Sequence, residues 1–290
     1  MAQNIFAVIG GSGLYELPGI ADVETVRTST PFGEPSGELM RGRLGGATVI
    51  FLPRHGRGHR VLPSEINFRA NLFALKVLGA EWLVSVAAVG SLREHLPPGS
   101  VVVPDQFIDR TVSRPSTFFG RGIVAHVSMA DPVCPVLSAS VADAAVAAGG
   151  TVQRSGTYLC MEGPQFSTRA ESHMYRQWGA DVIGMTNWQE AKLAREAEIC
   201  FASLTLVTDY DCWRAATDHV VIGDVLRVLR ANADLARRAV AGVAATLPAT
   251  RSCACARALE HAIITDPARI PAAVRTELAP LIGRYLGEPR

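Results

Sequence analysis

The chain has 290 residues, of which 48% are hydrophobic and 19% charged, so it can bury the core of one large α/β domain or of two smaller ones. Its 28 basic and 27 acidic side chains nearly balance, which argues against a dedicated nucleic-acid or membrane-surface binder. The first residues lack the pattern of a signal peptide, and no apolar run approaches the length of a membrane span. We therefore expect a cytoplasmic enzyme with no nucleic-acid or membrane partner.

Apolar runs of strand length alternate along the chain with segments of helical periodicity. Strands are predicted at residues 5–9, 47–52, 82–89, 100–104, 153–161, 181–185 and 199–207. Helices are predicted at 65–78, 135–148, 168–178, 189–197 and 222–245, with one more amphipathic helix within 268–286. This alternation predicts a single α/β domain over residues 1–290, with a central mixed β-sheet flanked by helices and a helical tail over about 250–290.

Three stretches carry expectations about the surface. Residues 110–129 form the longest irregular segment, which we expect to pass over the surface or toward a partner subunit. The helix at 189–197 is expected to place its Glu and Lys residues on an exposed side. His59 and Arg60, which follow the second strand, are expected to be solvated.

The last predicted strand runs directly into two carboxylates, Asp209 and Asp211. Residues two apart in a strand point to the same side, and strand ends are where open α/β sheets bind their ligands. Two carboxylates this close raise the pKa of one of them, which suits a proton donor. From these residues alone, the alternative is one Asp that caps the next helix and a second that is solvated.

Other strand ends carry groups that suit an anion. Arg54 offers a planar guanidinium to phosphate oxygens, with His55 beside it. The hydroxyls of Ser12 and Thr186 would add donors, and the small pair Ala87-Ala88 leaves room for backbone N–H groups to approach a ligand. Taken singly, the glycine-rich turn around Ser12 is equally consistent with a plain tight turn, and the small pair with a packing need.

A second group of residues suits a nucleoside. Phe166 would stack on a base, Ser167 next to it is small and neutral, and Met185 would lie against a sugar. Glu162 would bind a ribose hydroxyl or cap the helix that follows it. Together with the anion-binding groups and the two carboxylates, these residues predict a pocket for inorganic phosphate and a nucleoside.

The six cysteines do not form the framework of a small secreted domain. Cys160 and Cys200 lie in apolar runs, as buried thiols do. Cys253 and Cys255 are separated by one residue, which is tighter than the usual redox or zinc pair, and no matching His/Cys pair follows them. We therefore expect no metal site, while a disulfide, or a pairing of Cys134 with Cys200, stays open.

Seven blocks of sequence, in order, resemble the methylthioadenosine phosphorylases of the trimeric purine nucleoside phosphorylase superfamily. They are IGGSGLY at 9–15, PRHG at 53–56, NFRAN at 67–71, VGSL at 89–92, DQFIDR at 105–110, EGPQFSTRAES at 162–172 and TDYDCW at 208–213. The resemblance covers nearly the whole chain and implies the fold of that superfamily. It also implies that phosphate binds among Ser12, Arg54, His55, the backbone of Ala87-Ala88, and Thr186.

The resemblance also assigns the nucleoside. It implies that Met185 lines the ribose, Phe166 packs on the base, and Asp209 and Asp211 address the amino group and the imidazole-ring nitrogen of the purine. We expect a protonated Asp209 to be the general acid, with Asp211 holding the geometry of the proton. Ser167 stands where relatives that cleave inosine and guanosine carry Glu, which implies a 6-aminopurine site.

Three further roles follow only from the resemblance. Ile222 and Val225 would border the 5' substituent and favour a thioether. His126 is similar to a residue that relatives extend across a subunit boundary, which implies a homotrimer, alone or paired with a second trimer into a hexamer.

The sequence departs from the family at Ser12, where many relatives carry Thr, and at Ala87, where some do. It also departs at Trp188-Gln189, which replaces a small residue followed by Pro, and at Gln165, which replaces a frequent Arg. These departures leave the phosphate affinity and the 5' specificity open.

The activity implied by the resemblance is the phosphate-dependent cleavage of S-methyl-5'-thioadenosine to adenine and S-methyl-5-thio-ribose 1-phosphate, in methionine and purine salvage. Inorganic phosphate would be a co-substrate, and no metal or organic cofactor is expected. The alternatives are a phosphorylase of other 5'-deoxyadenosines, adenosine or inosine, a nucleosidase that uses water, and a nucleoside sensor without turnover. The anion-binding residues argue against the nucleosidase, because water needs no such site.

Overall fold

The computed structural model describes residues 5–11, 14, 19–214 and 222–286, and within the helix at 222–246 it leaves several N-terminal side chains undescribed. The strands are β1 Ile5–Gly10, β2 Ala21–Val26, β3 Leu39–Leu44, β4 Ala47–Pro53, β5 Ala80–Ser91, β6 Val101–Val102, β7 Gln106–Arg110, β8 Val152–Gln153, β9 Thr157–Met161, β10 Val182–Gly184 and β11 Cys200–Asp209. The helices are α1 Phe68–Val77, α2 Pro135–Ala147, α3 Arg169–Gln177, α4 Asn187–Glu196, α5 Ile222–Thr246, α6 Ala272–Glu277 and α7 Ala279–Leu286, with 3-10 turns η1 Ala254–Arg257 and η2 Pro267–Arg269.

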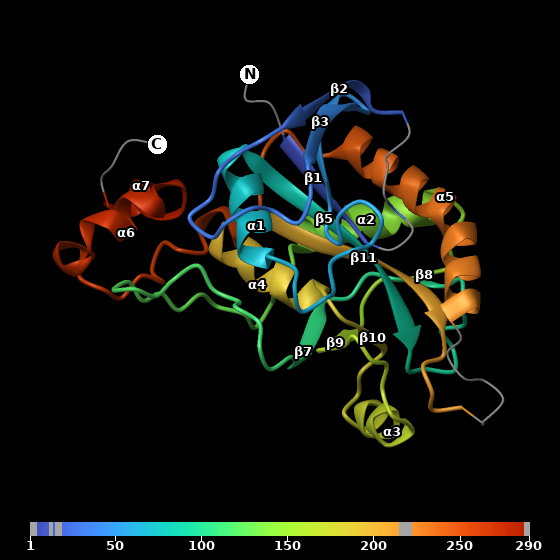
Figure 1. Cartoon of the computed structure of the whole chain (residues 1–290). Helices are drawn as coiled ribbons and strands as arrows, with labels where there is room; N and C mark the ends of the chain where they lie inside the picture. Colours follow the sequence, from blue (N-terminus) through green and yellow to red (C-terminus); the bar gives the residue numbers. More distant parts are fainter. Residues whose placement is uncertain (1–4, 12–13, 15–18, 215–221, 287–290) are drawn as a thin grey trace.

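These strands form one mixed sheet with helices on both faces (Figure 1). Its order is β2-β3-β4-β1-β5-β10-β9-β7, and β11 pairs with β5 on the edge opposite β1. The central strands β4, β1, β5 and β11 are parallel, whereas β2 and β3 pair antiparallel with each other and β3 with β4. The short strand β10 pairs antiparallel with β5 and parallel with β9. The predicted α/β class and the mixed sheet flanked by helices are confirmed.

The central strands divide their side chains between two apolar layers. In β1, Phe6 and Val8 pack into the layer under α2 and α5, while Ala7 and Ile9 pack into the layer under α1 and α4. This alternation is the two-residue period of a strand that is buried on both faces. Such a strand reads as a continuous apolar run, which is why the central strands were predictable.

The strand β5 is long and changes partners along one edge. On that edge, β1 pairs with residues up to Val86, and the short antiparallel strand β10 takes over at Gly90. On the opposite edge, β11 accompanies β5 throughout this stretch. Among the described strands, none therefore pairs with that edge between Val86 and Gly90, and the backbone of Ala87-Ala88 lies open there.

Several predicted boundaries were wrong. The strand expected at 153–161 is divided into β8 and β9, and the single tail helix expected within 268–286 is η2, α6 and α7. The sequence analysis missed β2, β3 and β7, because the side chains of β2 and β7 are mostly exposed and β3 is interrupted by two Arg residues and a glycine. The helix α4 starts at Asn187, two residues before the prediction.

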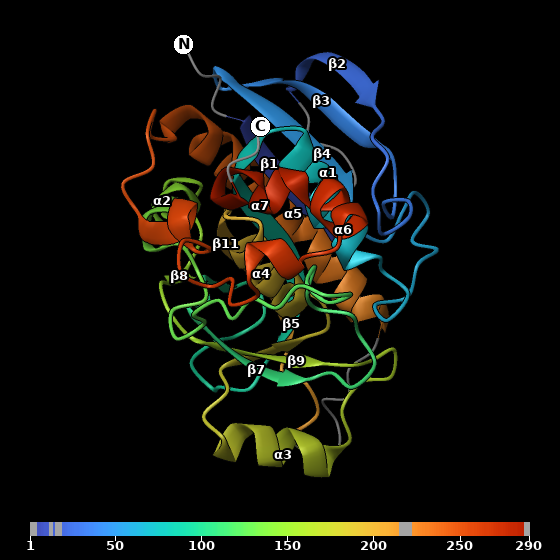
Figure 2. The same cartoon turned by 90° about the vertical axis from the view of Figure 1, so that its left-hand side faces the viewer.

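The irregular segment at 110–129 runs along the C-terminal segment (Figure 2). Ala125 forms a β-bridge with Ile263, and the N–H of His126 donates to the carbonyl of Ala262 over 2.9 Å. Apolar residues of α6 and α7 then join the core layer under α1. In the described part of the chain, no helix is both long and apolar enough to span a membrane.

Candidate active site

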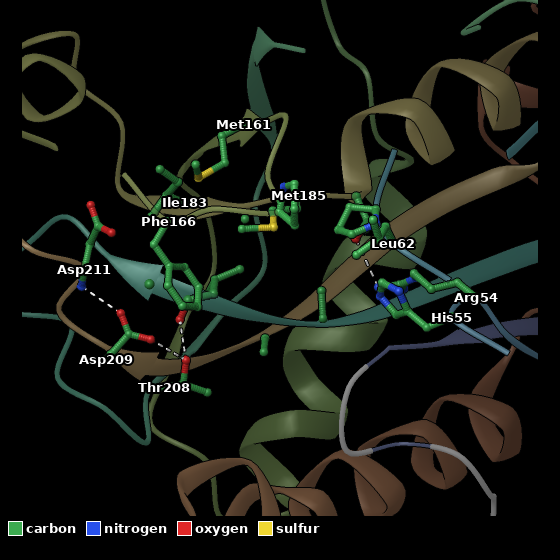
Figure 3. A pocket seen from close by; sticks show the side chains of 18 of the residues that line it. Arg54, His55, Leu62, Met161, Phe166, Ile183, Met185, Thr208, Asp209 and Asp211 are labelled. Atoms are coloured by element: carbon green, nitrogen blue, oxygen red, sulfur yellow. Dashed lines mark hydrogen bonds between the residues drawn. The ribbon is translucent and has the colours of Figure 1, made fainter. Parts of the chain in front are cut away.

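A cavity of about 530 Å³ opens where β4, β5, β10 and β11 end (Figure 3). Arg54 and His55 lie at one end of this cavity, and Asp209 and Asp211 lie at the other. Its lining brings together most of the predicted site residues: Arg54, His55, Ala87, Ala88, Phe166, Met185, Thr186, Asp209 and Asp211. Carboxyl ends of parallel strands are the usual location for such a site.

Arg54 is buried and held by protein groups on most of its donors. Its Nη2 donates to the Ser85 hydroxyl over 2.7 Å and to the carbonyls of Ile9 and Val86, while Nη1 donates to Thr186 Oγ1 over 3.1 Å. Nη1 carries two N–H groups, so one of them remains for a ligand within the described structure. The guanidinium is thereby fixed before any anion arrives.

Glu190 balances the charge of Arg54. Its Oε1 lies 2.9 Å from Arg54 Nε, and both side chains are about 1% exposed. Its Oε2 accepts hydrogen bonds from Ser85 Oγ over 2.5 Å and from Asn187 Nδ2 over 3.1 Å. The expectation of an exposed acidic side for this helix was wrong at Glu190 and Glu196, which are both buried.

Thr186 is the N-cap residue of α4, and its hydroxyl makes no capping bond to that helix. The hydroxyl accepts from Arg54 and keeps its own proton for another acceptor. The first N–H groups of a helix lack intrahelical partners and carry a partial positive charge. Thr186 therefore places a donor and a helix N-terminus at the anion end of the cavity.

His55 is held in one tautomer. Its Nδ1 lies 2.8 Å from the carbonyl of Val61, and since a carbonyl only accepts, Nδ1 carries the proton. Burial, with the charge of Arg54 beside it, lowers the pKa of His55 to about 4. At neutral pH, Nε2 therefore presents a lone pair, which suits the O–H of a monoprotonated phosphate.

His59 is exposed, as expected, and its ring also borders this end of the cavity. Its ring stacks on that of His55 with 4.3 Å between centroids, and it lines the cavity. Partial burial lowers the pKa of His59. In the sequence, the only indication that His59 lies beside His55 at the cavity is their spacing of four residues.

The unpaired edge of β5 faces the cavity between its two ends. Ala87 and Ala88 line the cavity, and both belong to the stretch where only β11 pairs with β5 among the described strands. A backbone edge without a strand partner offers N–H groups to a ligand. The prediction that Ala87-Ala88 contribute through their backbone agrees with this placement.

Asp209 carries two hydrogen bonds at the other end. Its Oδ1 accepts from the N–H of Asp211 and its Oδ2 from the hydroxyl of Thr208, each over 2.7 Å. Thr208 Oγ1 also lies 3.2 Å from the carbonyl of Val89, and its single proton can go to either acceptor. When the hydroxyl donates to Val89, its lone pair can accept a proton held on Asp209, so the site accommodates both protonation states.

Asp211 stands in the left-handed backbone region, with φ of 50°, which is uncommon for a residue other than glycine. Its Oδ2 is buried and has no hydrogen-bond partner among the described residues. Burial, with Asp209 adding to it, raises the pKa of Asp211 to about 6, and burial also raises the pKa of Asp209. A buried oxygen without a partner is suited to a ligand N–H.

The nucleoside side chains lie between the two ends of the cavity. Figure 3 shows Met185, Met161 and Ile183 along one wall and Phe166 over the cavity near Thr208. Phe166 is 48% exposed, so its ring has a free face for a base. Ser167 does not line the cavity itself, but its hydroxyl lies close enough to Asp211 to affect its pKa.

Besides Ser167, five predicted residues are not brought into the cavity by the described structure. Ser12 and the side chains of Ile222 and Val225 lie outside the described residues. His126 is not among the residues that line this cavity. Glu162 neither caps α3 nor lines the cavity; it accepts from Arg114 Nε over 3.0 Å and from the N–H of Val112 over 2.7 Å.

Comparisons with known proteins agree with this geometry. Residues 5–245 match the phosphorylase superfamily. S-methyl-5'-thioadenosine phosphorylase of Geobacter sulfurreducens is 53% identical over 98% of this chain and 100% of the relative, and that of Koribacter versatilis is 54% identical over 99% of each.

Solved structures give the same result. A methylthioadenosine phosphorylase from an Antarctic soil metagenomic library superposes with a TM-score of 0.87 at 48% identity, covering 97% of this chain and 99% of the other. A mutant adenosine/methylthioadenosine phosphorylase of Schistosoma mansoni, in complex with adenine, superposes with a TM-score of 0.82 at 36% identity, covering 89% of this chain and 96% of the other. The chain therefore belongs to the phosphorylase superfamily and, within it, to the family of the S-methyl-5'-thioadenosine phosphorylases.

Proposed function

We propose that this protein cleaves S-methyl-5'-thioadenosine with inorganic phosphate, giving adenine and S-methyl-5-thio-ribose 1-phosphate. The observation that carries the proposal is that one cavity holds a fixed guanidinium at one end and a buried carboxylate pair at the other. A nucleoside lying between them would present its anomeric carbon to the phosphate and its base to the carboxylates. Relatives at 53% and 54% identity bear the name of this activity.

In the proposed reaction, phosphate attacks the anomeric carbon while the bond to adenine breaks. Arg54, Thr186, the N-terminus of α4 and the open edge of β5 position the phosphate, whose charge stabilises the sugar cation. Asp209 donates a proton to the ring nitrogen of the leaving purine, and Thr208 exchanges hydrogen bonds with it. Asp211 Oδ2, which has no hydrogen-bond partner among the described residues, accepts a hydrogen bond from the exocyclic amino group of the purine.

The proposal includes no metal or organic cofactor in this reaction, with phosphate as co-substrate. It also includes a cytoplasmic homotrimer, alone or paired into a hexamer. The position of His126, outside the cavity of its own chain, supports a role at the site of a neighbouring subunit. Phosphorylase activity in which His126→Ala matched the wild type, or a monomer by light scattering, would contradict this part.

Adenosine is the second candidate substrate, because a 36% identical relative is named for both adenosine and methylthioadenosine. The test is initial rates with phosphate on methylthioadenosine, 5'-deoxyadenosine, adenosine and inosine. The proposal predicts the highest kcat/KM for methylthioadenosine and the lowest for inosine. A higher kcat/KM for adenosine would assign that substrate, and a preference for inosine would overturn the 6-aminopurine assignment.

A further inference from the structure

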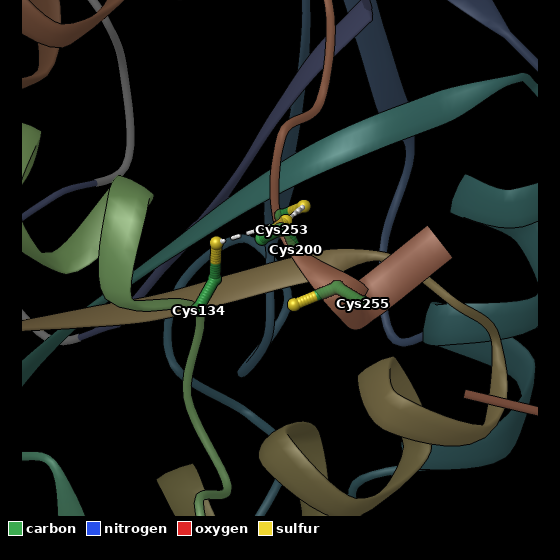
Figure 4. A group of neighbouring side chains, drawn as sticks. All are labelled: Cys134, Cys200, Cys253 and Cys255. Atoms are coloured by element: carbon green, nitrogen blue, oxygen red, sulfur yellow. Dashed lines mark hydrogen bonds between the residues drawn. The ribbon is translucent and has the colours of Figure 1, made fainter. Parts of the chain in front are cut away.

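Four of the six cysteines converge at one point, although they lie far apart in the sequence. Cys134 is the N-cap residue of α2, Cys200 begins β11, and Cys253 and Cys255 lie at the start of η1 (Figure 4). The four Sγ atoms all lie within 4.8 Å of one another. None of the four lines the cavity described above, so the cluster has no part in that site.

The separations within this thiol cluster are those of a metal shell. A tetrahedral zinc with Zn–S bonds of about 2.3 Å holds its sulfur atoms about 3.8 Å apart. Cys253 Sγ lies 3.6 Å from Cys134 Sγ and 3.3 Å from Cys200 Sγ. Shifts of less than about an ångström at the side chains would therefore turn the four thiols into a closed coordination shell.

The groups around the cluster suit thiolates. Arg195 Nη1 donates to Cys255 Sγ over 3.7 Å, and the N–H of Leu137 donates to Cys134 Sγ over 3.5 Å. Four thiolates around a divalent ion leave a net charge of −2, which the guanidinium partly offsets. Hydrogen bonds of this kind orient metal ligands and are part of such sites.

We propose that Cys134, Cys200, Cys253 and Cys255 bind one Zn²⁺ as a tetrathiolate site. Binding replaces the thiol protons, so up to four protons are released as four Zn–S bonds form. This differs from our expectation of no metal site, which considered only the close pair Cys253 and Cys255 and the residues after it. The other two ligands precede that pair by more than 50 residues.

The site is structural rather than catalytic. Four protein ligands leave no open position on the metal for a substrate. The ion would join β11 and the start of α2 to the C-terminal segment, whose residues Leu259, Val274 and Ile282 pack into the core layer under α1 and α4. Zinc binding should therefore hold residues 253–286 against the body of the protein.

The test is metal content of the full-length protein purified with a thiol reductant, measured by elemental mass spectrometry. We expect about one zinc per chain in the wild type, at least tenfold less in Cys253→Ser and Cys255→Ser, and an unchanged content in Cys160→Ala. Cys160 is the control because it is a buried thiol outside the cluster. Equal zinc in all variants would overturn the proposal.

A second measurement does not depend on the variants folding. Wild-type protein stripped with a chelator and reloaded with Co²⁺ should show the intense visible absorption of tetrahedral cobalt thiolate, at about one equivalent per chain. The stripped protein should melt at a lower temperature and regain its Tm with Zn²⁺. A reduced protein that takes up neither ion, or a native protein whose four cluster thiols resist alkylation until a reductant breaks disulfides, would overturn the site.

Discussion

The two ends of the cavity are built on opposite principles. At the anion end, Arg54 is buried and already paired with Glu190, Ser85 and Thr186. At the base end, Asp211 keeps a buried oxygen without a partner among the described residues, and its pKa is raised to about 6. At the anion end the binding groups are held in place before substrate binds, and at the base end a carboxylate oxygen is left for the substrate to satisfy.

This difference follows from what each end has to recognise. Phosphate is small and has the same shape and charge in every reaction cycle. Its binding groups can therefore be ordered and buried during folding, before the anion binds. The leaving base must receive a proton in the transition state, which requires a carboxyl group whose pKa is shifted upward. A carboxylate pair that lacks some of its hydrogen bonds destabilises the protein without substrate. The same carboxylates can then bind the purine in the transition state.

The largest effect is expected from removing the proton donor. Asp209→Ala should lower kcat by about 10²- to 10⁴-fold, the usual contribution of a general acid. The thermal melt of the variant should still be cooperative, because the carboxylate is not part of an apolar core. Steady-state kinetics with methylthioadenosine check this, and near-normal turnover would remove Asp209 from the mechanism.

Removing the counterion of Arg54 at the anion end should lower the free energy of unfolding. Glu190→Ala leaves the Arg54 charge buried without its counterion, and we expect a loss of about 3–5 kcal/mol in the free energy of unfolding. Glu38→Ala is the matched control, because its ion pair with Arg27 is exposed and its loss should cost at most about 1 kcal/mol. Urea unfolding measures both; equal losses would mean that the buried pairing is unimportant.

At the base end, by contrast, a mutation that removes the charge should stabilise the protein at neutral and alkaline pH. Because folding raises the pKa of Asp211 from 3.8 to about 6, its contribution to stability is present below pH 4 and lost as the pH rises through 6. Asp211→Asn cannot ionise, so at pH 8 it should be more stable than the wild type by up to about 3 kcal/mol.

At pH 4, the advantage of Asp211→Asn should disappear, since the wild-type carboxyl is then mostly protonated. Urea unfolding at pH 4, 6 and 8 measures the difference. A difference that stays constant across this range would show that Asp211 carries no raised pKa.

The smallest effect is expected at the residue that exchanges hydrogen bonds with Asp209. Thr208→Val keeps the shape of the side chain but removes the hydroxyl, worth about 0.5–1.5 kcal/mol for one hydrogen bond. We expect kcat to fall by up to about tenfold, with a shifted pH profile and an unchanged KM for phosphate. A raised KM for phosphate with normal kcat would mean that Thr208 acts in phosphate binding and not on Asp209.

The sequence predicted the parts of the fold that rest on buried apolar runs. Strands such as β1 and β11 are buried on both faces and therefore stand out. The strand β2 is almost entirely exposed and half of its residues are polar, so its place in the sheet depends on pairing with β3 rather than on its own pattern. Its identity as a strand could not be read from local sequence.

The same distinction applies to the site. Asp209, Arg54 and Thr186 were predicted because each follows a recognisable strand. Glu190 was missed because an acidic residue in a polar helix looks like a surface residue, and its partner Ser85 is 105 residues away. The thiol cluster was missed for the same reason, since only folding brings Cys134 and Cys200 to Cys253.

The central claim is that the anion end binds the attacking phosphate, and omission of phosphate tests it most directly. Adenine release from methylthioadenosine should be measured with and without inorganic phosphate, with the sugar product identified by mass. The account predicts release only with phosphate, and a sugar product that carries the phosphate at the anomeric carbon. Release at the same rate without phosphate, with free methylthioribose as product, would contradict it.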